Sequence, residues 1–152
     1  AARQLDPALL DDPDLMSALN SDYASIVSSH PAVRAALFET QRTFARQPGG
    51  AVLDGRDIGT VVFPDARVKL FVTASVAERA RRRFLELTAR GVAADPAQVE
   101  AEIRDRDAQD ANRPVAPLKP APDALEIDTT ALNAEQAFQA ALGLIRQSLD
   151  PA

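Results

Sequence analysis

The chain alternates short apolar runs with longer segments in which apolar residues recur at helical spacing. Three short segments are typical of strands, at residues 51–53, 68–72 and 125–128. The longer segments predict helices over about 17–28, 31–46, 76–90 and 96–110, and a last helix that begins after residue 133. Because strands alternate with helices, the sequence predicts an α/β fold with a parallel sheet and flanking helices.

Residues with strong positional preferences set the expected helix boundaries. Ser75 and Glu78 have the spacing of a capping box, and Gly91 suits the position that follows a helix C-terminus. Asn133 is a good N-cap for the last helix. These four residues predict where two of the helices begin and where one ends.

The helix over 31–46 has a recognisable start and one apolar face. Pro31 fits a first helical position, and His30 lies in the cap region before it. Val33, Leu37 and Phe44 recur at helical spacing. We therefore expect these three side chains to form the core face of this helix.

Composition excludes several kinds of chemistry. The 152 residues contain no cysteine and a single histidine, so disulfides, thiolate metal sites and multi-histidine clusters are excluded within them. Hydrophobic residues make up 46% and charged residues 26%, as in globular proteins. No apolar run is long enough to span a membrane, and Arg3 and Asp6 do not suit a signal peptide. We expect a cytoplasmic protein without membrane contact.

Charge argues against one class of partner and leaves another open. A net charge of −5 disfavours general nucleic-acid binding. The cations are 15 arginines and two lysines, Lys69 and Lys119. The arginine excess has two explanations: coding bias of a GC-rich genome, or planar guanidinium groups that bind phosphate or carboxylate.

The first candidate site follows the segment 51–53. Asp54, Gly55, Arg56 and Asp57 come directly after it, at the edge where open α/β sheets bind ligands. An aspartate here suits Mg²⁺, Arg56 suits a phosphate, and Asp57 can accept a hydrogen bond from an amino group. The alternative is an ordinary Asp-Gly turn with solvated charges.

The second candidate site lies along the helix over 96–110. Its apolar stripe begins with Val99 and Ile103 and continues on the same face into Arg106, Asp110 and Arg113. This face either binds a phosphate and a sugar hydroxyl or is an exposed helix end with an Arg106–Asp110 ion pair.

The third candidate lies on the helix over 76–90. Arg79 and Arg83 are four residues apart and share one face. The pair suits a basic lid over a polyphosphate, because phosphoryl transfer needs cations around the transferred group. The alternative is a solvated helix face, on which the aliphatic stems of the arginines lie along the protein and their guanidinium groups reach into water.

Together these segments resemble bacterial cytidylate kinases, a family of P-loop nucleoside monophosphate kinases. The matching segments cover most of the chain: 31–37, 53–65, 70–75, 78–83, 106–107, 110–113 and 115–118. The resemblance implies a parallel sheet with flanking helices. It also implies that residues 1–50 form part of the helical region that binds the nucleoside monophosphate. Residues 51–152 would form the rest of the core domain, with a lid at about 79–113.

The resemblance implies a role for each candidate residue. Four arginines would converge on the phosphate of CMP, of which the last three would be catalytic: Arg34, Arg56, Arg106 and Arg113. The remaining roles are cytosine recognition by Asp57 and Ser25, ribose binding by Asp110, Mg²⁺ binding by Asp54, and ATP binding in the lid by Arg79 and Arg83.

One family motif is not found in these residues. The family has a glycine-rich run of the form G-x-x-x-x-G-K-[ST] that cradles ATP phosphates, and the sequence contains no Gly-Lys step. We therefore expect an incomplete sheet that lacks the P-loop strand.

The implied activity is a (d)CMP kinase. It would transfer the γ-phosphoryl group of ATP, with Mg²⁺, to CMP or dCMP, and we expect a monomer. A related kinase with UMP as acceptor stays open, although Arg56 and Asp57 favour cytosine. The alternative is an inactive fragment or a module that binds a nucleoside monophosphate and needs a partner chain.

Overall fold

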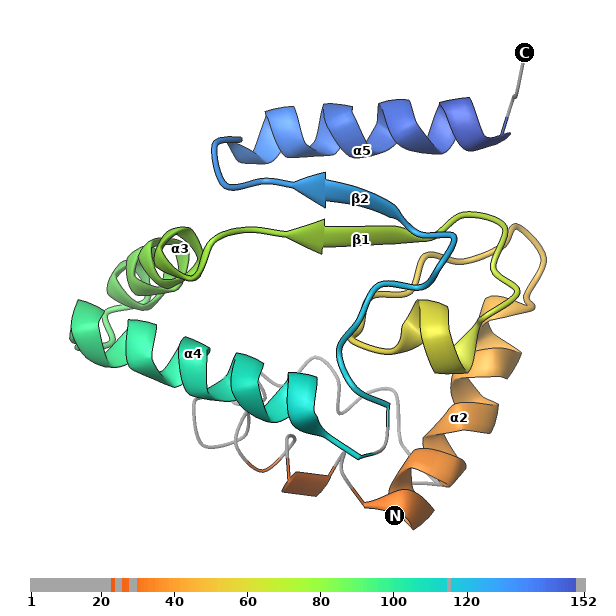
Figure 1. Ribbon diagram of the computed structural model, residues 1–152, viewed down its shortest axis with the longest axis horizontal. Coiled ribbons are helices and arrows are strands. Elements are labelled where there is room, and N and C mark those ends of the chain that lie inside the picture. Colours follow the sequence, from red (N-terminus) through yellow and green to blue (C-terminus); the bar gives the residue numbers. More distant parts are fainter. Residues whose placement is uncertain (1–22, 24–25, 28–29, 115, 150–152) are drawn as a thin grey trace. The chain divides into compact units, whose positions relative to one another are not determined.

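The computed structural model describes residues 23, 26–27, 30–114 and 116–149 (Figure 1). The chain divides into two compact units, residues 1–54 and 55–152. The predicted helix over 17–28 lies largely outside the described residues, of which Tyr23, Ile26 and Val27 are helical. Among the described helices, none is long and apolar enough to cross a membrane.

The second unit contains a parallel pair of strands (Figure 1). Strand β1 spans Leu70–Thr73 and strand β2 spans Leu125–Asp128. Leu70 pairs with Leu125 and Thr73 with Asp128, so the strands are in register over their full length. Helix α5, Ala134–Leu149, packs against β2. This confirms the predicted α/β class with a parallel sheet, and β1 begins two residues later than the pattern predicts.

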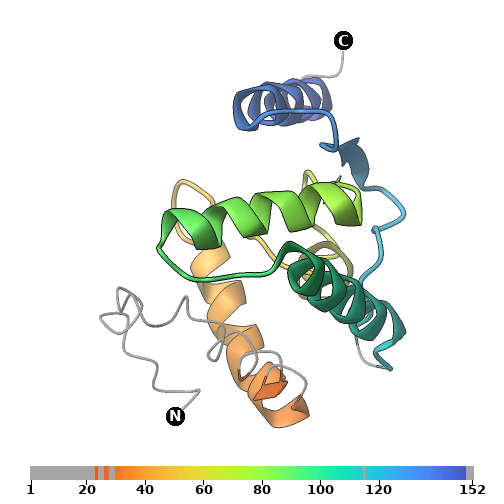
Figure 2. The ribbon, with the colours of Figure 1, turned by 90° about the vertical axis from the view of Figure 1, so that its left-hand side faces the viewer.

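Two helices form the connection between the strands. Helix α3 spans Val76–Ala89 and helix α4 spans Pro96–Asn112. They pack against each other, and Figure 2 shows α3 in green beside α4 in teal. The Ser75 hydroxyl accepts a hydrogen bond from the backbone N–H of Glu78, and Gly91 has a φ of 73°. The predicted N-cap and C-terminal glycine are therefore confirmed. The reciprocal half of the capping box is wrong, because the N–H of Ser75 donates to the Thr130 hydroxyl and the Glu78 carboxylate accepts from Arg81 and Arg82 instead.

A π-helical turn precedes β1 and was not predicted. It spans Ile58–Val62, and the Asp57 carbonyl accepts a hydrogen bond from the N–H of Val61 at 2.8 Å. A Cβ atom on Gly55 would lie 2.8 Å from Cγ1 of Ile58. Glycine at position 55 thus permits the close approach that this turn requires.

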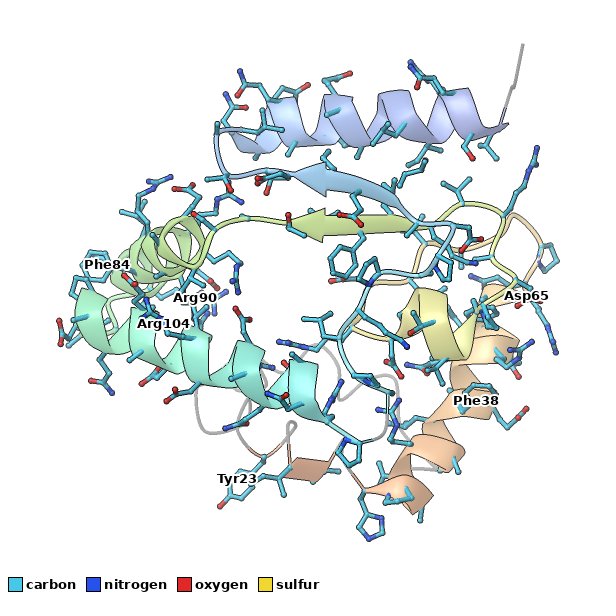
Figure 3. All side chains as sticks on the ribbon, viewed as in Figure 1. Tyr23, Phe38, Asp65, Phe84, Arg90 and Arg104 are labelled. Carbon is cyan, nitrogen blue, oxygen red and sulfur yellow. The ribbon has the colours of Figure 1, made fainter. Side chains whose placement is uncertain are left out.

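The first unit contains helix α2, Pro31–Ala45, which confirms the predicted helix. His30 is its N-cap but makes no side-chain cap hydrogen bond. Phe38, labelled in Figure 3, has the guanidinium of Arg42 5.4 Å from its ring centroid. Phe44, in the last turn, is 54% exposed, so its prediction as a core residue is wrong.

Residues 51–53 do not form the predicted strand. Their backbone is irregular, and Val52 is 98% exposed. A strand is stabilised by the ladder of hydrogen bonds to a neighbour, and this segment takes part in none of the described pairings. Its short apolar run alone was therefore a misleading signal.

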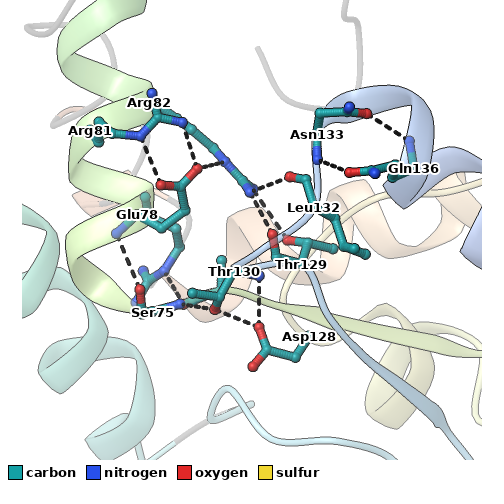
Figure 4. Close-up of polar contacts among 12 residues, drawn as sticks. Ser75, Glu78, Arg81, Arg82, Asp128, Thr129, Thr130, Leu132, Asn133 and Gln136 are labelled. Carbon is teal, nitrogen blue, oxygen red and sulfur yellow. Dashed lines mark hydrogen bonds and ion pairs between the residues drawn. The ribbon is translucent and has the colours of Figure 1, made fainter.

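A polar network joins α3 to the carboxyl ends of both strands (Figure 4). One Arg82 Nη donates to the carbonyls of Thr129 at 2.6 Å and Leu132 at 3.1 Å. The buried Thr129 hydroxyl donates to the Thr73 carbonyl at 2.9 Å. Asn133 and Gln136 cap the start of α5 reciprocally, which confirms the predicted N-cap.

Candidate active site

Asp110 lies at the centre of the candidate site. Asp110 is only 4% exposed, and its carboxylate forms an ion pair with Arg56. The other carboxylate oxygen lies 3.6 Å from an Nη atom of Arg113. One buried carboxylate therefore contacts two arginines, one from the loop before the π-helical turn and one from the C-cap of α4.

The charges around Arg56 extend this cluster. The pKa of Arg56 is lowered, first by burial and then by the positive charges of Arg106 and Arg113. Asp107 opposes this effect and Arg79 adds to it. Four guanidinium groups and two carboxylates thus interact here, with a net charge of +2. Positive charge in excess within a half-buried site favours binding of an anion.

One hydrogen-bond donor of Arg113, its Nε atom, is unpaired among the described residues. One Nη donates to the Ala116 carbonyl at 3.0 Å, whereas Nε is buried and has no hydrogen-bond partner in the part of the chain that the structure describes. Ala116 itself has a φ of 52°, a left-handed conformation that is unfavourable for alanine. A buried donor without a partner costs free energy, which an anionic acceptor can recover.

The two predicted lid arginines are both paired with carboxylates. Arg79 donates to both oxygens of Asp107, at 2.9 and 2.6 Å, and its Nε donates to the Ala74 carbonyl at 2.9 Å. Arg83 contacts Glu86 at 2.9 Å within α3. An incoming polyphosphate would have to compete with these carboxylates.

The other predicted site residues are distributed as follows. Asp57 is half-buried beside Arg56, and its backbone begins the π-helical turn. Arg34 is half-buried on α2 and Asp54 is exposed; both belong to the first unit. Ser25 lies outside the described residues. The structure brings together Arg56, Asp110 and Arg113, with the exposed Arg106 within electrostatic range.

Sequence reasoning assigned no role to two well-connected residues. The first is Asp107, the partner of Arg79, although it follows Arg106 and precedes Asp110 by one helical turn. The second is Lys69, which is 8% exposed and contacts both Asp123 oxygens, at 2.8 and 2.6 Å. A lysine directly before an apolar strand was the available signal for this buried pair.

Comparison with known proteins gives a consistent result. A protein-family model described as cytidylate kinase matches residues 7–147. A cytidylate kinase from Rhodopseudomonas palustris (strain TIE-1) is 55% identical over 144 residues, which are 95% of this chain and 68% of that protein. A cytidylate kinase from Cereibacter sphaeroides (strain ATCC 17023) is 57% identical over 145 residues, 95% of this chain and 70% of the relative. One from Methylocella silvestris is 53% identical over 150 residues, 99% and 69% of the two chains.

Proposed function

Because this chain belongs to the cytidylate kinase family, whose members are nucleoside monophosphate kinases, we propose that it binds CMP or dCMP and acts in phosphoryl transfer to them from ATP. The single observation that carries the proposal is the Arg56–Asp110–Arg113 cluster. A nucleotide phosphate carries a charge of about −2 at neutral pH, which would balance the net charge of this cluster and its neighbours.

The phosphate would be held by arginines. Arg56 and Arg113 already converge on one point, and Arg106 contributes to the same field. Arg34 is part of the proposal as a fourth phosphate ligand, on the basis of family resemblance alone. Guanidinium groups suit this role because they offer several donors in one plane to phosphate oxygens.

The sugar and the base would be recognised by carboxylates. Asp110 would accept hydrogen bonds from ribose hydroxyls, and dCMP fits as a second substrate because one such hydroxyl suffices. Asp57 would accept from the amino group of cytosine, with help from Ser25. A carboxylate that accepts from this amino group is an established mode of cytosine recognition.

The reaction needs no general base. The attacking group is an oxygen of the CMP phosphate, which is already anionic. Catalysis would come from positioning and from neutralisation of charge, with Arg56, Arg106 and Arg113 around the acceptor phosphate. We keep Arg79 and Arg83 as candidate ATP ligands within a lid at about 79–113.

Asp54 is the candidate for the metal that accompanies ATP. Among the described residues, no group of three or more acidic, histidine or cysteine side chains could hold a metal ion. A single exposed carboxylate nevertheless fits Mg²⁺, which takes most of its other ligands from phosphate oxygens and water. Bound with ATP, Mg²⁺ supplies neutralisation of the phosphate charge.

The assignment of regions and setting forms part of the proposal. Residues 1–50 would belong to the region that binds the nucleoside monophosphate, and residues 51–152 to the core domain. The protein would act as a cytoplasmic monomer without nucleic-acid or membrane partners, and its net charge of −5 is unfavourable for a phosphate backbone.

A second candidate function is a module that binds CMP and acts together with a partner chain. The 152 residues contain no G-x-x-x-x-G-K-[ST] run, so a P-loop that binds ATP would have to come from residues outside them. Under this alternative, CMP would bind as proposed, whereas ATP would bind only with the partner.

Ligand-dependent thermal unfolding tests the proposal. CMP and dCMP should raise the unfolding temperature by mass action, and UMP should do so less at equal concentration. Stabilisation by Mg²⁺-ATP as well would favour the kinase, whereas stabilisation by CMP alone would favour the module. No response to CMP at saturating concentration would overturn both candidates.

A further inference from the structure

Arg79 ties three parts of the second unit together. Its Nε donates to the carbonyl of Ala74, between β1 and α3, and its two Nη atoms donate to Asp107 on α4. The guanidinium therefore has a bidentate partner and a backbone partner at once. Both side chains are about one-third exposed, at 35% and 33%, which limits screening by solvent.

This ion pair differs from the others on the same two helices. The pairs of Arg83 with Glu86 and of Arg104 with Glu100 each join residues of one helix. Within the described α3 and α4, only Arg79 with Asp107 forms an ion pair between the two helices. It therefore restrains the position of α4 relative to α3 rather than the helicity of either.

Asp107 occupies a critical place on α4. It follows Arg106 directly, and Asp110 lies three residues further, one turn along the same face. A shift of α4 at Asp107 would move Asp110 away from Arg56. The charges of Asp107 and Arg79 also act on the pKa of Arg56, so this ion pair lies within electrostatic range of the Arg56–Asp110–Arg113 cluster.

We propose that Asp107 is a positioning residue, which acts through Arg79 to hold α4 where Arg106 and Asp110 meet the bound nucleoside monophosphate. This inference rests on the proposed function. It assigns Asp107 no contact with substrate. For Arg79 it replaces the ATP contact proposed above with a role at the CMP site, because the same guanidinium cannot hold Asp107 and a polyphosphate with the same donors.

Calorimetric titration of the full chain with CMP tests the inference. Asp107→Asn removes the charge and one acceptor at nearly constant volume, and should raise the Kd for CMP roughly tenfold. Asp107→Glu can re-form the pair and should stay within about threefold of the unchanged chain. Arg79→Lys keeps the charge but loses the planar fork, so it should resemble Asp107→Asn.

The matched control lies two turns away on the same helix. Glu100→Gln breaks the exposed Arg104–Glu100 pair and should leave the Kd for CMP unchanged. The double variant Arg79→Lys with Asp107→Asn should bind CMP no more weakly than the weaker single variant, because both changes remove one interaction. Circular dichroism identifies a temperature at which every variant is folded.

The outcomes separate this inference from the proposed function. If the unchanged chain does not bind CMP, the proposed function fails and this inference with it. If it binds CMP and Asp107→Asn lowers only the unfolding temperature, the pair is merely structural and this inference alone is overturned. An Arg79→Lys variant with unaltered CMP binding but weakened Mg²⁺-ATP binding would overturn it in favour of an ATP contact. If Asp107→Asn does not fold, Arg79→Lys decides.

Discussion

Arg56 and Asp110 lie 54 residues apart in the sequence and form an ion pair in which the aspartate is almost completely buried. The carboxylate thereby occupies a position between Arg56 and Arg113 where an anion is electrostatically favoured. Substrate must therefore share these arginines with a negative charge that the protein itself supplies. The Asp110 carboxylate and the substrate phosphate therefore compete for the same arginines. This competition predicts how the free energy of unfolding should respond to phosphate.

Asp110→Asn should make the fold depend on phosphate. Without the carboxylate, Arg56, Arg106 and Arg113 repel one another, and the free energy of unfolding should fall by roughly 1 to 2 kcal/mol, less than for a fully buried pair because Arg56 is 35% exposed. Inorganic phosphate should then raise the unfolding temperature of Asp110→Asn more than that of the unchanged chain. Asp105→Asn, an exposed position of α4, is the control. An equal response to phosphate in all three proteins would contradict this prediction.

Arg113→Ala should weaken CMP binding roughly 10- to 100-fold, because it removes charge-assisted hydrogen bonds and the buried Nε donor. Arg113→Lys should recover only part of the affinity, since it lacks the planar fork. Calorimetric titration with CMP measures both, with Arg104→Ala as a control on an exposed arginine of α4 (Figure 3). Undiminished affinity in Arg113→Ala would remove this residue from the proposed phosphate site.

Local signals in the sequence predicted local structure well. The Ser75 and Asn133 N-caps are correct because each depends on atoms within one helical turn. The strand predicted at 51–53 is wrong because strand formation depends on a partner that the segment itself does not encode. The π-helical turn after Asp57 was missed since no short pattern distinguishes it from an ordinary loop.

The same distinction holds for the candidate site. Family resemblance singled out Arg56, Asp110 and Arg113, and the structure brings them together. Asp107 was overlooked because its partner lies 28 residues earlier, on another helix. Neither spacing nor composition specifies such a pair; only the packing of α3 against α4 does.

Glu78 should contribute to the free energy of unfolding at neutral pH and lose this contribution in acid. Hydrogen bonds from Arg81 and Arg82 lower the pKa of Glu78 from 4.5 to about 2. Because the pKa is lower in the folded state, this contribution is fully present above pH 4.5 and is lost as the pH falls towards about 2. Urea unfolding should show Glu78→Gln to be less stable than the unchanged chain at neutral pH. The gap should narrow at low pH, and a gap that stays constant would contradict the assignment.

Lys69 should stabilise the fold through its aliphatic stem as well as its charge. The stem lies beside Gly59, where an added Cβ atom would be 3.3 Å from Cδ of Lys69, and the ammonium group pairs with the exposed Asp123. Lys69→Met keeps most of the apolar contact and should cost about 1 kcal/mol, whereas Lys69→Ala should cost about 2 kcal/mol more, because it leaves a cavity. Equal losses in urea unfolding would show that the stem contributes little.

The parallel pairing of β1 with β2 has a kinetic consequence. Leu70 and Leu125 are neighbours in space, but the chain between them must first be brought into a closed loop that includes both α3 and α4. Closing so long a loop costs entropy before any strand hydrogen bond forms, whereas each helix can form from local contacts. We therefore expect the amides of α3 to become protected early in refolding and those of β2 late. Pulsed hydrogen exchange measures this order, and protection of β2 before α3 would contradict the prediction. The paired strands β1 and β2 would then be among the last parts of this unit to assemble.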